Sequence, residues 1–289
     1  MGDLLAVLAL LLFAGNAFVV RAAAAHLGQR VGFLVALVAN VVVAAVLVAV
    51  QLAVRSEPLR IDPFAVGMFA VAGVFAGYLG RRGYFRTVET IGPSRASAIQ
   101  NSSPAFALVL GWLLLGERLG PVELACMGGV LLGLYLASGR LAGGAVPWRE
   151  IGVGLFSAAA YAVGNIIRGD ALDRWSEPLL GALAGAVAAT VVYALLHRPA
   201  WSEVAGPRRP RRGLALWLLS GALTIGGQAS VIASTAYLPV SVAVAISAAT
   251  PMVVIPVSVL LLANRERVRP RTAVGAVLIA AGVAGLLLV

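Results

Sequence analysis

Two neighbouring arginines, Arg81 and Arg82, interrupt a long apolar run and are the strongest chemical signal in the chain. An arginine at the bilayer centre costs at least about 2.5–3.5 kcal/mol, so such residues usually face a cavity and have a function. Successive helix residues point about 100° apart, so the two side chains cannot both face one cavity squarely. We expect one to bind an acidic group, and Arg82 is our first candidate because it falls opposite Gln228 in an internal repeat.

A less interesting interpretation of the two arginines remains open. Spans as short as about 17 residues are allowed. The helix that carries the arginines can therefore end at Leu79, which would leave both guanidinium groups at the membrane interface.

Several amides and a tyrosine within apolar runs are the other candidates for the site. Asn16 and Asn165 each follow a glycine near the start of one half of the chain, and Gln100 and Asn101 directly precede Pro104. Such amides offer donors and acceptors to a substrate, although hydrogen bonds between helices are an equally good explanation of the two asparagines. The predicted substrate site is Asn16, Arg81, Arg82, Gln100, Asn101, Tyr161, Asn165 and Gln228.

The composition places these residues in a membrane. Hydrophobic residues make up 61% of the 289 residues and charged residues only 12%, against about 25% in soluble domains. The net charge of +10 comes entirely from arginines, which lie mostly between apolar runs. That pattern is typical of cations near lipid headgroups and argues against nucleic-acid binding.

The sequence lacks the residues that several classes of chemistry require. Without lysine, neither a P-loop ending in Gly-Lys-Ser/Thr nor a Schiff base can form. Cys126 is alone, and His26 and His197 lie at the ends of apolar runs. We therefore expect no enzyme activity, no cofactor and no metal site.

The apolar runs predict an all-α membrane protein of about ten transmembrane helices. Runs four and nine each contain an internal proline. The expected spans are Leu4–Ala24, Val31–Val54, Phe64–Thr90, Arg95–Leu115, Val122–Leu141, Ile151–Leu172, Pro178–Leu196, Leu214–Ala236, Val240–Ala263 and Ala273–Val289.

The two halves of the chain resemble each other. A Gly-Asn pair opens each half, and runs broken at Pro104 and Pro251 are each followed by a Glu-Arg pair and a glycine-rich helix. We interpret residues 1–141 and 150–289 as two five-helix repeats, inverted because each has an odd number of spans. Inverted repeats with broken helices are a transporter design, with Pro104 and Pro251 as bending points. A duplicated structural unit without transport activity is the alternative.

These motifs resemble the drug/metabolite transporter superfamily, specifically its ten-helix EamA-type carriers. The resemblance rests on residues 92–97 (GPSRAS), 103–106 (SPAF) and 112–119 (WLLLGERL), with second copies at 249–252 (ATPM) and 260–267 (LLLANRER). The second copy departs from Gly-Glu-Arg with Asn264-Arg265-Glu266. The resemblance implies a secondary carrier with a cavity between its halves.

Arginines rather than carboxylates within the spans favour an anionic or zwitterionic solute over a lipophilic cation. The expected function is secondary transport of a small polar metabolite across the cytoplasmic membrane by alternating access. A lipid-linked-phosphate flippase and a non-transporting membrane subunit are the alternatives. The expected partners are a small-molecule substrate and the lipid bilayer, not nucleic acid, with the protein a monomer or a homodimer.

The orientation of the chain receives conflicting signals. An even number of spans places both termini on one side. The arginine-rich loop at Arg208–Arg212 then favours termini outside by the positive-inside rule, whereas the family resemblance implies cytoplasmic termini.

Overall fold

A computed structural model describes residues 1–55, 59–110, 120–137, 147–197, 211–234, 237, 246–247, 250–261 and 270–288. Within these residues all regular structure is helical, which confirms the predicted class. The first half contains α1 (Gly2–Ala24), α2 (Gln29–Val54), α3 (Pro63–Ala72), the π-helical segment η1 (Gly73–Gly80), α4 (Arg81–Ile91), α5 (Pro93–Gln100), α6 (Ser103–Leu110) and α7 (Pro121–Ala137). The second half contains α8 (Trp148–Arg174), α9 (Pro178–Leu196), α11 (Arg211–Ser234), α13 (Thr250–Leu261) and α14 (Pro270–Leu288).

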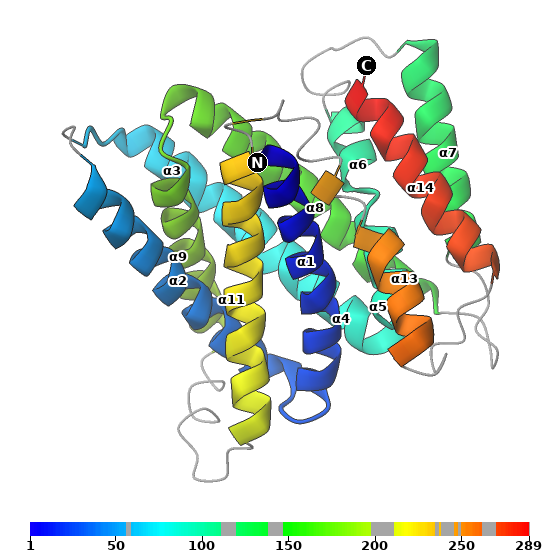
Figure 1. The fold of residues 1–289 in the computed structure, drawn as a ribbon, viewed down its shortest axis with the longest axis horizontal. Helices are drawn as coiled ribbons and strands as arrows, with labels where there is room; N and C mark the ends of the chain where they lie inside the picture. The colour runs from blue at the N-terminus through cyan, green and yellow to red at the C-terminus, as the bar shows by residue number, and fades with distance from the viewer. Residues whose placement is uncertain are drawn as a thin grey trace.

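The described helices include six that are long and apolar enough to cross a bilayer. They are α1, α2, the continuous span Pro63–Ile91, α8, α9 and α11. Expected spans four, five and nine extend into residues 111–119, 138–146 and 240–245, which lie outside the described part of the chain. Both chain ends lie at the same end of the bundle (Figure 1), as an even number of crossings requires.

The first helices of the two halves run in opposite directions. Arg21, near the end of α1, donates to the carbonyls of Val88 and Glu89 at the end of α4. Glu150, at the start of α8, forms an ion pair with Arg86 of the same α4 segment. The end of α1 and the start of α8 therefore lie at the same end of the bundle, as expected of inverted repeats.

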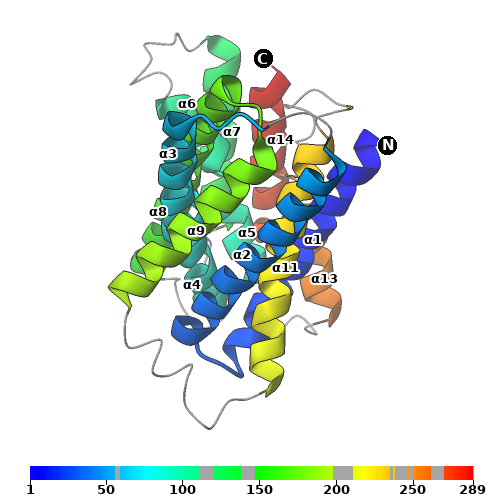
Figure 2. The same ribbon diagram turned by 90° about the vertical axis from the view of Figure 1, so that its left-hand side faces the viewer.

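Each half packs its first helix against the third helix of the other half. Helix α1 contacts α11, and α8 contacts the continuous α3–η1–α4 helix. Helix α2 lies between α9 and α11 and contacts both (Figure 2). Helices α7 and α14 pair with each other at one side of the bundle (Figure 1). The interface between the halves thus combines the packing of α1 on α11, of α2 on α9 and α11, of α8 on the continuous α3–η1–α4 helix, and of α7 on α14.

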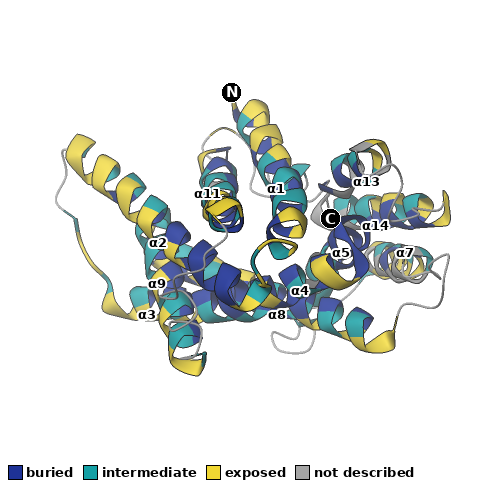
Figure 3. Ribbon diagram, turned by 90° about the horizontal axis from the view of Figure 1, so that it is seen from below, coloured by how far each residue is buried: buried dark blue, intermediate teal, exposed yellow. Residues whose placement is uncertain are grey.

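Glycines allow the close approach of η1 and α9. A Cβ added at Gly73 would lie 2.2 Å from the carbonyl oxygen of Gly185, and one at Gly181 would lie 2.4 Å from the ring of Phe69. Such contacts between small residues are a common way to bring membrane helices together. Large apolar residues of α1 and α2 are exposed, which suits contact with acyl chains. Figure 3 colours the exposed residues of both helices yellow.

Glycine and proline set the break between α4 and α5. Gly92 has a φ of 90°, a conformation that favours glycine, and its N–H caps the carbonyl of Val88. Pro93 then begins α5, where a missing N–H costs little.

The proline-containing run in the first half is broken as expected. Helix α5 ends at Gln100, and α6 begins at Ser103, directly before Pro104. Pro251 is likewise the second residue of α13. The helix of the third span, in contrast, continues from Pro63 to Ile91. The alternative in which it ends at Leu79 is therefore wrong.

Candidate functional site

Arg81 lies in the interior, at the junction of η1 and α4. Its side chain is only 2% exposed, and its Nη2 donates to Thr224 Oγ1 of α11 at 2.9 Å. The guanidinium carbon lies 5.4 Å from the centre of the Phe85 ring, in cation–π range. Its Nε is buried without a hydrogen-bond partner, and no described carboxylate forms an ion pair with Arg81. A charged group with spare donors is thus held away from water.

Asn16 of α1 reaches the same threonine from the opposite side. Its Nδ2 donates to Thr224 Oγ1 at 3.1 Å, while its Oδ1 is buried without a partner. Thr224 in turn donates to the carbonyl of Ser220 at 2.8 Å. One hydroxyl from the second half therefore organises an amide and a guanidinium group from the first half.

Helix α8 adds a polar face from the second half. Tyr161, Asn165 and Arg168 occur at positions i, i+4 and i+7, which lie on one side of a helix. Tyr161 interacts electrostatically with both Arg81 and Arg168, and its ring packs against Gly80. Asn165 is exposed and accepts from Arg168 at 3.5 Å. These residues extend the positive environment of Arg81 along α8.

Ser157 ties this face of α8 to the broken helix. Its hydroxyl lies 2.6 Å from the carbonyl oxygen of Gly80 and 2.8 Å from Oε1 of Gln100. Ser157 thus links Gln100 to Gly80, against which the Tyr161 ring packs, and the buried Asn101 follows Gln100 at the end of α5. We call Asn16, Arg81, Tyr161, Arg168 and Thr224 the central polar cluster.

Two predicted residues lie apart from the central polar cluster. Arg82 is exposed, donates to the Tyr78 hydroxyl at 3.3 Å and faces the ring of Tyr193 on α9. Gln228 is half-buried one turn beyond Thr224 on α11. The structure thus places Arg81, rather than our first candidate Arg82, at the interface between the halves.

Thr224 and Arg168 were absent from the predicted site. The signal for Thr224 is the polar row Ser220, Thr224 and Gln228, spaced by four residues within an apolar run. Arg168 follows Asn165 by three residues and shares its helix face.

Comparison with known proteins agrees with this architecture. The model of the EamA-like transporter family matches residues 1–139 and 148–288. The chain belongs to the EamA-like transporter family. It is therefore a membrane transporter of small solutes. A crystal structure of a protein matches this EamA-like transporter with a TM-score of 0.61 at 22% identity, over 98% of this chain and 95% of the other, which shows a shared fold. No curated protein matches it in sequence.

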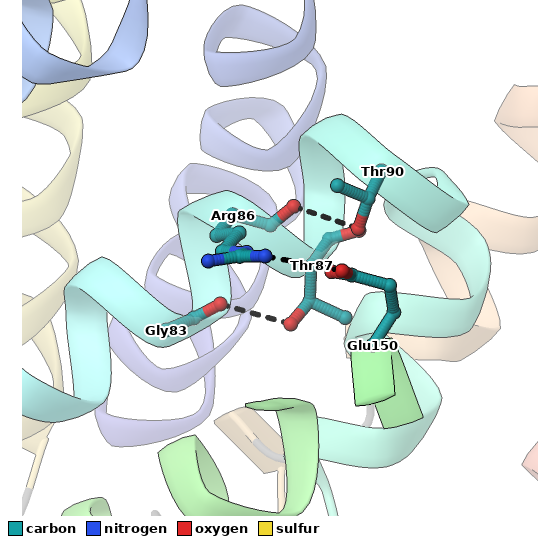
Figure 4. A network of polar contacts seen from close by, with 5 residues as sticks. All are labelled: Gly83, Arg86, Thr87, Thr90 and Glu150. Atoms are coloured by element: carbon teal, nitrogen blue, oxygen red, sulfur yellow. Dashed lines mark hydrogen bonds and ion pairs between the residues drawn. The ribbon is translucent and has the colours of Figure 1, made fainter. Parts of the chain in front are cut away.

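Ion pairs join the two halves of the EamA-like transporter at both ends of the interface. At one end Arg86 of α4 pairs with Glu150 of α8 at 3.1 Å. Figure 4 shows this pair beside Thr87 and Thr90, whose hydroxyls bond to carbonyls of their own helix. At the other end Arg55 pairs with Glu177, and Arg174 pairs with Asp62 at 2.9 Å.

Asp62 also caps the start of α3. One of its carboxylate oxygens accepts from the backbone N–H groups of Phe64 and Ala65 at 2.9 and 3.1 Å. The Ala65 bond is the main reason that the pKa of Asp62 lies below its usual value, and Arg174 lowers it further. The arginines at the two ends thus have carboxylate partners, whereas Arg81 between them has none among the described residues.

Proposed function

We propose that this transporter carries a small anionic or zwitterionic solute across the cytoplasmic membrane and that Arg81 binds its acidic group. The observation that carries the proposal is the buried Arg81 guanidinium group, which has an unpartnered Nε and no described carboxylate partner. Arginine remains charged in proteins, so the site holds an uncompensated positive charge. A carboxylate or phosphate is the ligand that its planar donors fit best.

The rest of the central polar cluster supports an acidic ligand. Arg168 adds a second positive charge, and Tyr161 interacts electrostatically with both arginines. Asn16 supplies an unpartnered Oδ1 that can accept from an ammonium or hydroxyl group. Together these groups suit a solute with an acidic group and a neighbouring donor, such as an amino acid or a hydroxy acid.

The arrangement also supports alternating access. The cluster draws residues from both halves, and ion pairs bridge the halves at both ends of their interface. In our proposal the pairs at one end separate while those at the other end hold, so the cluster opens to one side at a time. Pro104 and Pro251 begin the helical segments that bend during this exchange.

Uptake into liposomes tests the proposal. Purified protein would be offered labelled amino acids, organic anions, phosphorylated metabolites and lipophilic cations. We expect uptake of an acidic solute, reduced about 30-fold or more in Arg81→Gln, because losing a buried charge pair costs at least about 2 kcal/mol.

Arg211→Gln is the matched control, since Arg211 is exposed at the start of α11. It should transport like the wild type, and both variants need the same thermal unfolding profile in detergent. Uptake of cations alone, or normal acidic uptake by Arg81→Gln, would refute the proposal.

A further inference from the structure

A second basic pocket lies where α2 begins, where α9 ends and where α4 starts. Its lining residues are Gln29, Arg30, Phe33, Arg82, Tyr193 and His197, and its volume is about 300 Å³. It is separate from the central polar cluster, none of whose residues lines it. Two arginines and a histidine are among its described lining residues, none of which is a carboxylate.

Hydrogen bonds and ring contacts hold the walls of this pocket in place. Gln29 donates to the Arg82 carbonyl at 3.2 Å, and Tyr193 donates to the Arg30 carbonyl at 2.5 Å. The His197 ring stacks on Tyr193 with centres 4.4 Å apart, and the Arg82 guanidinium lies 5.9 Å from the same ring. The cations are thus positioned by three different helices rather than scattered on a surface.

The electrostatic environment of His197 indicates an anion site. Burial lowers the pKa of His197, and the charges of Arg82 and Arg30 lower it further. The groups facing its ring are Arg30 from α2, Arg82 from α4, Tyr78 from η1 and Tyr193 from its own helix. The charges of two arginines from two different helices therefore act on this imidazole ring.

The position of the pocket favours a lipid over a dissolved ion. Helix α9 ends at Leu196 and α2 starts at Gln29, so the pocket lies at the level where apolar helices meet the headgroups. Exposed apolar side chains lie along the same helices toward the bilayer core, including Val38 and Val42 on α2 and Val191 and Leu195 on α9. Helices α2 and α9 contact each other along this surface (Figure 2).

We propose that the pocket of Arg30, Arg82 and His197 binds the phosphate headgroup of an anionic phospholipid, with its acyl chains along α2 and α9. Basic pockets between membrane helices are a known way to hold acidic lipid headgroups. The phosphate oxygens accept from Arg82 and Arg30, and the imidazole adds a third donor when it is protonated. This site is independent of the transported solute.

Native mass spectrometry of the purified full chain would measure binding of phosphatidylglycerol and of phosphatidylcholine. We expect preferential binding of phosphatidylglycerol, weakened about fivefold in Arg82→Gln and about 30-fold when Arg30→Gln is added. Arg82→Lys, which keeps the charge, should stay close to the wild type. Arg211→Gln removes an exposed arginine outside the pocket and should change nothing.

Phosphatidylglycerol binding should also be tighter at pH 5 than at pH 8, because a protonated His197 adds a cation, and His197→Gln should remove this dependence. Wild-type affinity in the Arg30→Gln/Arg82→Gln variant would overturn the site. Equal displacement of the lipid by low concentrations of inorganic phosphate would show a free-phosphate site and overturn the lipid assignment. Binding is read without transport, so the result does not depend on the proposed solute.

Discussion

Thr224 is the residue whose loss should damage the central polar cluster most clearly. Its hydroxyl accepts from Arg81 at 2.9 Å and from Asn16 at 3.1 Å, and valine has nearly the same shape without the hydroxyl. Thr224→Val therefore leaves a buried guanidinium group and a buried amide each with one donor unpartnered. A hydrogen bond to a charged group contributes about 1.5–3 kcal/mol, and a neutral one between membrane helices about 0.6–1.5 kcal/mol. We expect Thr224→Val to lower the free energy of unfolding by about 2–4 kcal/mol.

Two controls isolate the hydroxyl of Thr224. Within the described part of the chain, Thr190 of α9 donates its hydroxyl to the carbonyl of Ala186 at 2.7 Å and makes no other side-chain hydrogen bond, so Thr190→Val loses this bond without leaving a buried charge unpartnered. Thr224→Ser keeps the acceptor. Reversible unfolding in mixed micelles, followed by circular dichroism, compares the three variants. If Thr224→Val is no less stable than Thr190→Val, the hydroxyl does not hold the cluster together and the reasoning fails.

Three further changes test other parts of the structure. In Gly80→Ala the new Cβ would lie 2.7 Å from an aromatic ring of α8, so we expect the free energy of unfolding to fall by about 1–3 kcal/mol. Gly152→Ala is the control, because a Cβ at Gly152 meets open space and should not lower stability. Thermal unfolding compares the two variants, and equal stability would contradict the packing at Gly80. Replacing Pro104 and Pro251 together with leucine should slow solute turnover in liposomes while leaving solute binding largely intact, and unchanged turnover would exclude them as bending points. Because the pKa of Asp62 is lowered from 3.8, its stabilisation is present at pH 7 and is lost as the pH falls through the lower folded value. The difference in melting temperature between the wild type and Asp62→Ala should therefore shrink as the pH falls below about 4, and a difference that does not change with falling pH would refute this.

Most helices could be predicted from the sequence because apolar length and flanking residues decide them. The expected span Pro178–Leu196 coincides with α9, and α1 and α2 begin only two residues earlier than expected. The third span was harder to predict, because hydropathy falls at Arg81 and Arg82 and leaves an end at Leu79 as an alternative. The contacts that support the continuous helix are tertiary: Thr224 of the other half accepts a hydrogen bond from Arg81, and Ser157 donates to the Gly80 carbonyl.

Tertiary structure also explains why the sequence predicted only part of the candidate site. The sequence shows that one of two neighbouring arginines faces inward, but not which one. The π-helical segment Gly73–Gly80 decides this, because wider turns change the direction in which the following residues point, and hydrophobic periodicity does not reveal them. Repeat symmetry singled out Arg82 through Gln228, and the structure buries Arg81 instead.

The two halves share helix positions but not chemistry, and this difference bears on how the transporter works. Asn16 is buried and bonded across the interface, whereas Asn165, its counterpart in the repeat, is exposed and contacts Arg168 of its own helix. A symmetric site would present the same groups to a solute from either side of the membrane. Here the first half contributes the buried cation Arg81, and the second half contributes Thr224, whose hydroxyl accepts a hydrogen bond from it. In the mechanism that we propose, motion of α11 relative to α4 would change the partners of the buried charge directly and would couple solute binding to the rearrangement of the two halves.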